Sequence, residues 1–427
     1  MAIAGSDGVM TRVWFFKGAK ALGYHRGTDR VDTGPSPLAD LFPTLAAQGF
    51  NSPDAAVNLG NGKVYFFKGS EYVRWDIRTG KLDLLRIPIA KEWIGFDKCK
   101  LPNGKTFADG IDAALNWWNG KVYFFRGAHY IRYDLKKNQV DLKMGVVPIA
   151  KEWNGFSEAR AAGGKTFADG VDAAIDWGDG KVYFFRDDAY LRYDKFDDHV
   201  DEGWPKKIGR DHVTRKENWP GLRKARFATK VKAAVDLFPG GEIFLDDADR
   251  METNQPQGPA FIDRPWRGVL HTTEGNNVND AIGTFRKKNV WPHFTIDPAT
   301  DRIVQHYTLS RGARALKNPQ GVHTNDARAI QIEIVGRAAR AGDLTADQLA
   351  FVRRVMLLIE EKVPIARRSG LTFVGSPAQT KKVRLKDKKE GSEWARFAGW
   401  CGHQHVPGND HWDPGAIDVA TLVAPNR

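Results

Sequence analysis

A short pattern that recurs four times in the first half of the chain constrains the fold more than any other feature. Each copy has Asp or Lys, then two alanines and an aliphatic residue, and the copies start at Asp54, Asp112, Asp172 and Lys232. A glycine-containing turn and an aromatic strand follow the first three copies, at residues 63–67, 121–125 and 181–185. Short strands repeated at a fixed period predict a radial array of similar sheets.

The first and last copies of the repeat are incomplete in complementary ways. The aromatic strand at residues 13–16 has no inner strand before it, whereas the copy at Lys232 is followed only by a weak second strand at residues 241–245. We expect the segment 232–235 to pair with the N-terminal strand and close the ring. Closure is physically sensible, because an unclosed sheet edge at this place would invite aggregation.

Over about residues 9–247 the pattern resembles hemopexin repeats. The resemblance implies an all-β, four-bladed propeller with the Asp-Ala-Ala strand innermost and the aromatic strand second. Tyr, Phe and Trp side chains at strand spacing are expected to fill the spaces between blades. The propeller is then expected to be a targeting module for a protein or glycan, although a fold alone does not fix a function.

Hemopexin-like domains use the central channel for ions. The resemblance therefore implies that a Ca²⁺ or Na⁺ ion occupies the channel, bound by backbone carbonyls, with Asp54, Asp112 and Asp172 nearby.

Composition narrows the class of partner. The chain has 427 residues, a net charge of +12 and an isoelectric point near 9.5, which favours an anionic partner such as a bacterial envelope. No nucleic-acid-binding motif is present, and no apolar run is long enough to span a membrane. The N-terminus shows no Sec signal, so we expect synthesis in the cytoplasm and action outside it, after lysis or specialised delivery.

The second half alternates strands and helices after a polar linker at residues 248–262. We expect strands at residues 268–273, 293–296, 303–307 and 329–335, and helices at residues 277–289 and from Thr345, where Thr345 and Gln348 form a capping box. This order predicts an α/β domain at residues 263–427 with a mixed sheet flanked by helices.

Histidine and aspartate are concentrated in residues 402–415, GHQHVPGNDHWDPG, which the prolines and glycines mark as a turning loop. A catalytic zinc takes three protein ligands and leaves one position for water. The loop offers His403 and Asp413, and His271 at the end of an apolar strand is the candidate third ligand. Taken alone, His271 is more often a hydrogen-bonded core histidine.

Residues 264–419 resemble zinc-dependent N-acetylmuramoyl-L-alanine amidases of the type 2 family, which includes phage endolysins and is related to peptidoglycan recognition proteins. Gly402-His403 and Asp413-Pro414-Gly415 match the family's closing motif. The resemblance implies zinc ligands His271, His403 and Asp413, and bacterial peptidoglycan as substrate.

The resemblance also assigns roles to two further residues. Glu333, in Ile-Gln-Ile-Glu-Ile, would act as general base on the attacking water, although a buried glutamate is more often structural. His411 stands where many relatives carry lysine and would stabilise the oxyanion. Pro292 replaces the tyrosine that some phage relatives carry before His-Phe.

The remaining site candidates are Thr273, His323 and Asn325, which we expect to contact substrate, whereas His293 and His405 are expected to be structural. The sequence thus predicts a peptidoglycan amidase, an antibacterial effector or a lysin. Two alternatives stay open: a non-catalytic peptidoglycan-recognition protein, and an ion-dependent adhesion or toxin protein that acts through its propeller.

Overall fold

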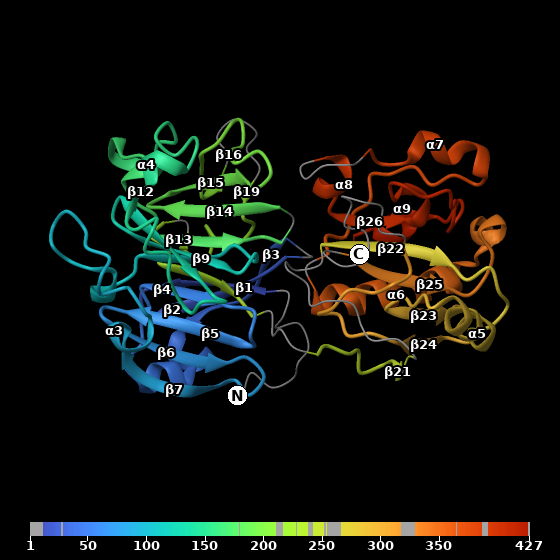
Figure 1. The fold of residues 1–427 in the computed structure, drawn as a ribbon, viewed down its shortest axis with the longest axis horizontal. Helices are drawn as coiled ribbons and strands as arrows, with labels where there is room; N and C mark the ends of the chain where they lie inside the picture. The colour runs from blue at the N-terminus through green and yellow to red at the C-terminus, as the bar shows by residue number, and fades with distance from the viewer. Residues whose placement is uncertain are drawn as a thin grey trace. The chain divides into compact units, whose positions relative to one another are not determined.

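The chain forms two compact units, Met1–Gly240 and Gly241–Arg427 (Figure 1). The computed structural model describes residues 12–26, 29–178, 180–210, 217–227, 229–237, 242–251, 253, 266–316, 329–363, 365–386 and 392–425. No helix within these residues is long and apolar enough to cross a membrane.

The first unit is a four-bladed β-propeller whose blades are antiparallel sheets. The first blade contains β20 (Ala233–Asp236), β1 (Arg12–Lys17), β2 (Lys20–His25) and β3 (Arg30–Pro37). The second contains β4 (Ala55–Asn58), β5 (Lys63–Lys68), β6 (Glu71–Asp76) and β7 (Lys81–Pro88). The third contains β8 (Ala113–Asn116), β9 (Lys121–Arg126), β10 (His129–Asp134), β11 (Gln139–Val140) and β12 (Val147–Pro148). The fourth contains β13 (Ala173–Asp176), β14 (Lys181–Arg186), β15 (Ala189–Asp194), β16 (His199–Val200) and β17 (Lys206–Lys207).

Short elements connect the blades. They are α1 (Leu38–Leu41), α2 (Pro43–Ala47), α3 (Ile89–Glu92), α4 (Ile149–Glu152) and a small hairpin of β18 (Gly209–Arg210) and β19 (Glu217–Asn218).

The Asp-Ala-Ala segments form the innermost strands, as predicted. Strands β4, β8, β13 and β20 lie next to one another in turn around the axis, and the first two alanines, Ala55 and Ala56, are buried. Ring closure is confirmed as well, because β20 pairs antiparallel with β1 from Val13↔Asp236 to Phe16↔Ala233. The first blade therefore joins the two ends of the propeller sequence.

Aromatic side chains pack between neighbouring blades, as expected from their strand spacing. Trp153 contacts Phe125 in the third blade and Phe184 and Tyr193 in the fourth, with ring centroids 5.2–5.4 Å apart. Equivalent buried aromatics from connecting segments are Phe42, Trp93 and Trp219. Each blade interface is thus a separate apolar cluster.

The predicted boundary of the propeller at residue 247 is wrong. Ile243 and Leu245 are buried against the second unit: the Ile243 N–H donates to Thr308 Oγ1, and the Leu245 N–H donates to Gln305 Oε1 at 2.8 Å. Residues 242–245 are therefore not a second strand of the first blade, because β1 already occupies that position beside β20. Part of the predicted linker is also strand, β21 (Asp249–Arg250).

The second unit contains a six-stranded mixed sheet in the order β21-β24-β23-β25-β22-β26. Its other strands are β22 (Arg267–Thr272), β23 (Phe294–Asp297), β24 (Arg302–Gln305), β25 (Ala329–Ile334) and β26 (Gly399–Gly402). Strands β22, β23, β25 and β26 run parallel, so their carboxyl ends share one edge of the sheet. Strand β26 was not predicted from the sequence.

Five helices accompany this sheet in the described residues: α5 (Val278–Lys288), α6 (Ala346–Lys362), α7 (Thr380–Val383), α8 (Glu393–Arg396) and α9 (Val419–Val423). The two longer helices match the prediction. Asn277 caps α5 by accepting the Asp280 N–H, and the Thr345–Gln348 capping box begins α6. Helix α5 buries Val278, Ala281, Ile282 and Phe285 on one face.

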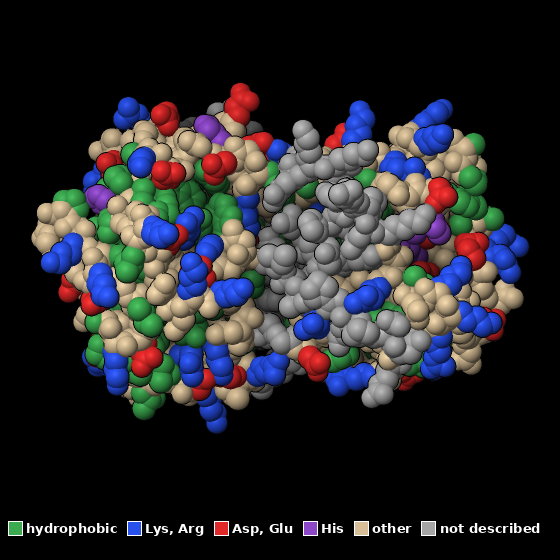
Figure 2. Space-filling model, viewed as in Figure 1, with side chains coloured by type: hydrophobic (Ala, Val, Ile, Leu, Met, Phe, Trp, Pro, Cys, Tyr) green, Lys and Arg blue, Asp and Glu red, His purple; other side chains and the backbone are tan. Residues whose placement is uncertain are grey.

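Lys and Arg side chains do not gather into a single stripe on the face drawn in Figure 2. Over the described residues of each unit they are interspersed with Asp and Glu.

Candidate functional site

Two histidines reach the carboxyl-terminal edge of the sheet from neighbouring strands. His271 lies near the end of β22, and His403 follows the last residue of β26. These strands are parallel partners, with Leu270 paired to Gly402, so the two imidazoles emerge side by side. Asp413 returns to the same place from the loop beyond β26.

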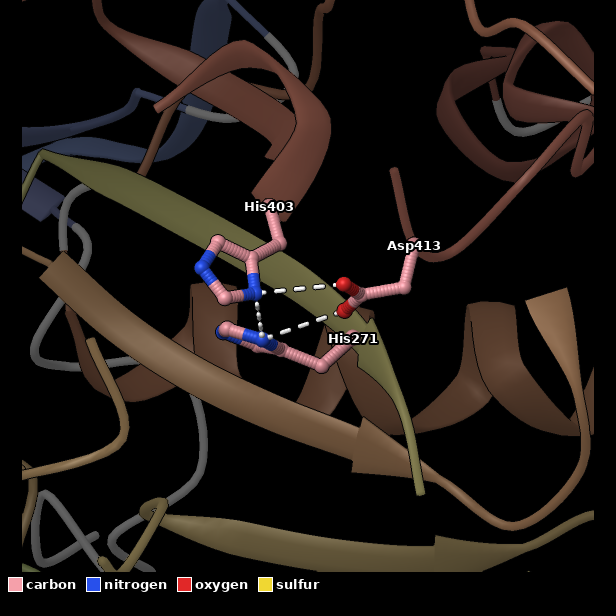
Figure 3. Close-up of side chains that lie close together, drawn as sticks. All are labelled: His271, His403 and Asp413. Carbon is pink, nitrogen blue, oxygen red and sulfur yellow. Dashed lines mark hydrogen bonds and ion pairs between the residues drawn. The ribbon is translucent and has the colours of Figure 1, made fainter. Parts of the chain in front are cut away.

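The three predicted ligands converge on one point, with His271 and His403 directed at the Asp413 carboxylate (Figure 3). The two Nδ1 atoms are 3.1 Å apart, and they lie 3.4 and 3.2 Å from the nearer Asp413 oxygens. Ligands 2.0–2.1 Å from a tetrahedral zinc are roughly 3.3 Å from one another. The three residues therefore fit a zinc ion.

Electrostatics keeps the ligand atoms in the form that a metal requires. Burial lowers the pKa of His403 to about 4, so its ring is neutral at physiological pH. Burial alone would raise the pKa of Asp413, but the neighbouring His403, together with hydrogen bonds from His271 and His411, holds it well below its ordinary value. A neutral imidazole and a carboxylate are metal ligands.

Buried amides fix the loop that carries His403 and Asp413. Gln404 donates through Nε2 to the carbonyls of Trp412 and Gly415 at 3.2 and 2.9 Å. Asn409 donates to the His403 carbonyl at 3.2 Å and accepts the His411 N–H at 2.7 Å. These bonds join the two ends of the loop, so its ligands are held before any metal binds.

Two of the histidines in the second unit are structural, as predicted. His405 Nδ1 accepts the Gly402 N–H at 2.9 Å, and its Nε2 bonds the Thr372 carbonyl at 3.0 Å. His293 Nδ1 accepts the Gln331 N–H at 3.0 Å. Both histidines are buried.

Glu333 lies beside the ligand cluster on the next strand. It is the register partner of His271, and its Oε1 is 3.9 Å from His271 Nδ1. Burial raises the pKa of Glu333 well above its ordinary value, and the negative charges of Asp413 and Glu274 add to this effect. A divalent cation in the site would lower that pKa again.

His411 stacks on His403 with ring centroids 4.3 Å apart, and its Nδ1 lies 3.4 Å from Asp413 Oδ1. Its side chain is 54% exposed, in contrast to the buried ligands. His411 is therefore the histidine of this cluster that a substrate can reach.

A pocket of about 340 Å³ opens at the cluster. It is lined by His271, Thr272, Thr273, Glu274, Thr284, Phe285, Lys288, Val290, Ala315, Leu316, Glu333, His403, His411 and Asp413. The volume is in the range of small-molecule sites.

Thr273 lies in the pocket, but its hydroxyl is engaged with the backbone N–H groups of Gly275 and Gly336, at 3.2 and 3.4 Å. The other two predicted substrate contacts, His323 and Asn325, lie outside the described residues. Nothing in the sequence alone singles out Glu274 or Lys288. Only the packing of α5 and of the turn after β22 brings them to the pocket.

The three aspartates predicted beside a channel ion are used inside the blades. Asp54, Asp112 and Asp172 accept the backbone N–H groups of Gly69, Gly127 and Asp187 at 2.7–2.8 Å. The central cavity of the propeller is instead lined at its polar end by Asn58, Asn116, Asp176 and Asp236. Asp54, Asp112 and Asp172 therefore lie at the ends of the inner strands opposite to the polar end of the cavity.

Cations already pair with the channel carboxylates. Lys195 Nζ lies 2.9 Å from Asp176, and Arg26 lies 3.5 Å from Asp236. The channel ion itself stays a prediction.

Comparison with known proteins identifies the repeats of the first unit. The hemopexin family model matches residues 53–97, 111–158 and 171–212. Albumin-2 of Pisum sativum is 33% identical over 120 residues, which are 27% of this chain and 50% of that protein, and Albumin-2 of Lathyrus sativus is 32% identical over 133 residues, 30% and 56%. The chain thus spans about half the length of these curated relatives.

Two solved amidase structures resemble the chain distantly. An AmpD derivative is 17% identical, with 43% of this chain and 96% of that chain covered and a TM-score of 0.28. The N-acetylmuramoyl-L-alanine amidase LysC from Clostridium intestinale is also 17% identical, with 41% and 94% covered and a TM-score of 0.25. The repeats and the closed ring together make the first unit a hemopexin-like four-bladed propeller.

Proposed function

We propose that the second unit is a zinc-dependent N-acetylmuramoyl-L-alanine amidase. The observation that carries this proposal is the convergence of His271, His403 and Asp413 at 3.1–3.4 Å beside a carboxylate in a pocket. Three ligands with a pocket on their open side are typical of hydrolytic rather than structural zinc sites.

The residues around the ligands have the chemistry that amide hydrolysis needs. A zinc ion bound by the three ligands would make a water more acidic and polarise the scissile carbonyl. Glu333 accepts the proton of the attacking water and passes it to the nitrogen of L-alanine as the C–N bond breaks. His411 donates an N–H to the carbonyl oxygen as negative charge develops there. The products are the lactyl carboxylate and a peptide with a free amino terminus.

The apolar part of the pocket suits the groups on either side of that bond. Phe285, Val290 and Leu316 contribute apolar surface to the pocket lining. The lactyl group and L-alanine each carry one methyl group that such a surface accommodates. The propeller would hold the enzyme at its target by binding a protein or glycan, and action on the wall follows lysis or specialised delivery.

Purified sacculi test this function directly. The zinc-loaded full chain should release stem peptides that begin with free L-alanine, as identified by mass spectrometry. Glu333→Gln should lower the rate by roughly 10²–10⁴-fold while zinc content stays unchanged. Glu242→Gln, an exposed glutamate of the same unit, is the matched control. An unchanged rate in Glu333→Gln, or cleavage at another bond, would contradict the proposal.

If the zinc-loaded chain binds sacculi but releases no peptide, the protein is a peptidoglycan-recognition protein without enzymatic activity. If the protein is instead an adhesion or toxin protein that acts through its propeller, substitution of His271, His403 or Asp413 would leave its activity unchanged.

A further inference from the structure

Lys288 places a positive charge in a pocket that is otherwise acidic. Besides the ligand Asp413, the pocket is lined by the carboxylates of Glu274 and Glu333. Lys288 is the sole lysine or arginine among the described residues of this lining. It is exposed, and no hydrogen bond or ion pair links it to any other described residue.

The acidic side of the pocket is fixed by its surroundings. Glu274 follows β22 with a left-handed backbone, φ 54°, and its Oε1 accepts from Thr272 Oγ1 at 2.7 Å and from the Ala338 N–H at 2.8 Å. This carboxylate is therefore held against the loop after β25, on the side of Glu333. A substrate carboxylate would be repelled from that side, because like charges in a partly desolvated site disfavour one another.

Lys288 lies on a different element from the ligands. It is the last residue of α5, one turn beyond Thr284 and Phe285, which also line the pocket. The ligands come from the sheet edge, whereas Lys288 comes from the helix, so the acidic groups and the basic group of the pocket are carried by different elements. A substrate with a carbonyl at one end and a carboxylate nearby fits in one direction only.

We infer that Lys288 selects substrates with a free carboxylate near the scissile amide. This inference rests on the proposed amidase function. In stem peptides the residue after L-alanine is a γ-linked D-glutamate, whose α-carboxyl group is either free or amidated. With the scissile carbonyl at the zinc ligands, this group is the first anion along the peptide. A Lys288–carboxylate contact favours the free acid over the amide.

Lys287 is a control for the stabilising effect that any lysine has at the carboxyl-terminal end of α5. Arg286, Lys287 and Lys288 all lie in the last turn of α5, where a positive charge stabilises the helix through its dipole. Lys287 shares the helix end and the exposure but does not line the pocket. A helix-end effect predicts equal results for Lys287→Met and Lys288→Met, whereas a carboxylate contact predicts different ones.

Two synthetic substrates test the inference. Both are N-acetylmuramoyl-L-alanyl-γ-D-glutamyl-L-alanine amides, and they differ only in the D-glutamate α-carboxyl group, which is a free acid in one and an amide in the other. The zinc-loaded full chain should cleave the free acid with a kcat/KM roughly tenfold higher than the amide, the order expected for a hydrogen bond to a charged group. In Lys288→Met this ratio should fall toward one, and in Lys287→Met it should stay at the wild-type value. Equal kcat/KM values for the two substrates in the wild type would overturn the inference, as would a ratio unchanged in Lys288→Met.

Binding separates this inference from the proposed reaction. The dissociation constants of both muropeptides are measured by calorimetry on zinc-loaded Glu333→Gln, with and without Lys288→Met. A preference for the free acid that depends on Lys288 supports selection even if the wild type cleaves neither compound, an outcome that would refute the amidase proposal alone. Cleavage of both compounds at equal rates with equal affinities would instead leave the amidase proposal standing and refute selection by Lys288.

Discussion

His271 and Glu333 are register partners on adjacent parallel strands, and their Nδ1 and Oε1 atoms lie 3.9 Å apart. The proposed metal ligand and the proposed general base are thus placed by the same pair of backbone strands. Because both residues lie on strands, the sheet rather than a loop sets the distance between them, which favours a precise geometry.

Zinc should stabilise the second unit through the three ligands. Adding zinc at about 1,000 times its Kd should raise the free energy of unfolding by about 4 kcal/mol, because the ion binds the folded form alone. His403→Ala should remove this gain, measured as the zinc-dependent shift in Tm. His199→Ala, at an exposed propeller position, should keep it. Equal shifts in the two variants would argue against the ligand set.

Gly402 should be intolerant of a side chain. A Cβ atom there would lie 2.4 Å from Pro414 Cδ and 2.9 Å from the Phe373 ring, so Gly402→Ala must displace the loop that carries Asp413. We expect at least a tenfold loss of zinc affinity, measured by competition with a chromophoric chelator. Gly283→Ala, in α5 with open space around it, is the control and should leave zinc affinity unchanged.

Stability of the zinc-free second unit should fall in mild acid. Burial lowers the pKa of His293 to about 4 and that of His306 to about 3, from a usual value of 6.5. Between these values the unfolded chain binds protons that the folded chain does not, so the stabilisation is complete above pH 6.5 and is lost as the pH falls toward 4. Each histidine contributes a slope of up to about 1.4 kcal/mol per pH unit.

Urea unfolding followed by tryptophan fluorescence, with chelator present, measures this slope. His306→Gln should reduce it, whereas His199→Gln should not. A stability that is flat between pH 4 and 6.5 would contradict the prediction.

The interface aromatics should dominate propeller stability. Trp93→Ala should lower the free energy of unfolding by about 3–5 kcal/mol, because this buried ring contacts Phe67, Phe124 and Tyr133 across two blades. The neighbouring Ile94, 51% exposed, provides the control, and Ile94→Ala should change stability by less than about 0.5 kcal/mol. Denaturant titration of both variants distinguishes the two.

The position of the boundary between the units determines which fragment of the second unit should be more stable. A fragment of residues 241–427 should unfold at a higher temperature than one of residues 255–427, because the shorter one lacks Ile243 and Leu245, which are 4% and 2% exposed. Burying two such side chains contributes roughly 3–6 kcal/mol. Equal melting temperatures would place residues 241–254 outside the folded unit.

Much of this architecture could be predicted from local patterns. The blade strands follow from a repeat, and the candidate metal ligands His403 and Asp413 belong to one motif whose parts are close in sequence. His271 required a strand that ends at a histidine. In each case one short segment carries the information.

The features that were predicted wrongly depend on contacts between segments far apart in the chain, which the sequence does not reveal. Residues 241–245 have a strand-like pattern, but the place beside β20 was already taken by β1 from the other end of the propeller. Asp54 was assigned to the channel because the inner strand was expected there, yet its carboxylate accepts the N–H of Gly69 in the next hairpin. Lys288 and Glu274 reach the pocket only through packing.

The pairing of β1 with β20 also bears on how the molecule is made. As the chain leaves the ribosome, the strand at residues 12–17 must remain without its inner partner until residue 236 has emerged. Contacts this distant in sequence form slowly. The first blade is therefore the last blade to be completed during synthesis. Until then, its unpaired strand makes it the part of the propeller most exposed to misassociation.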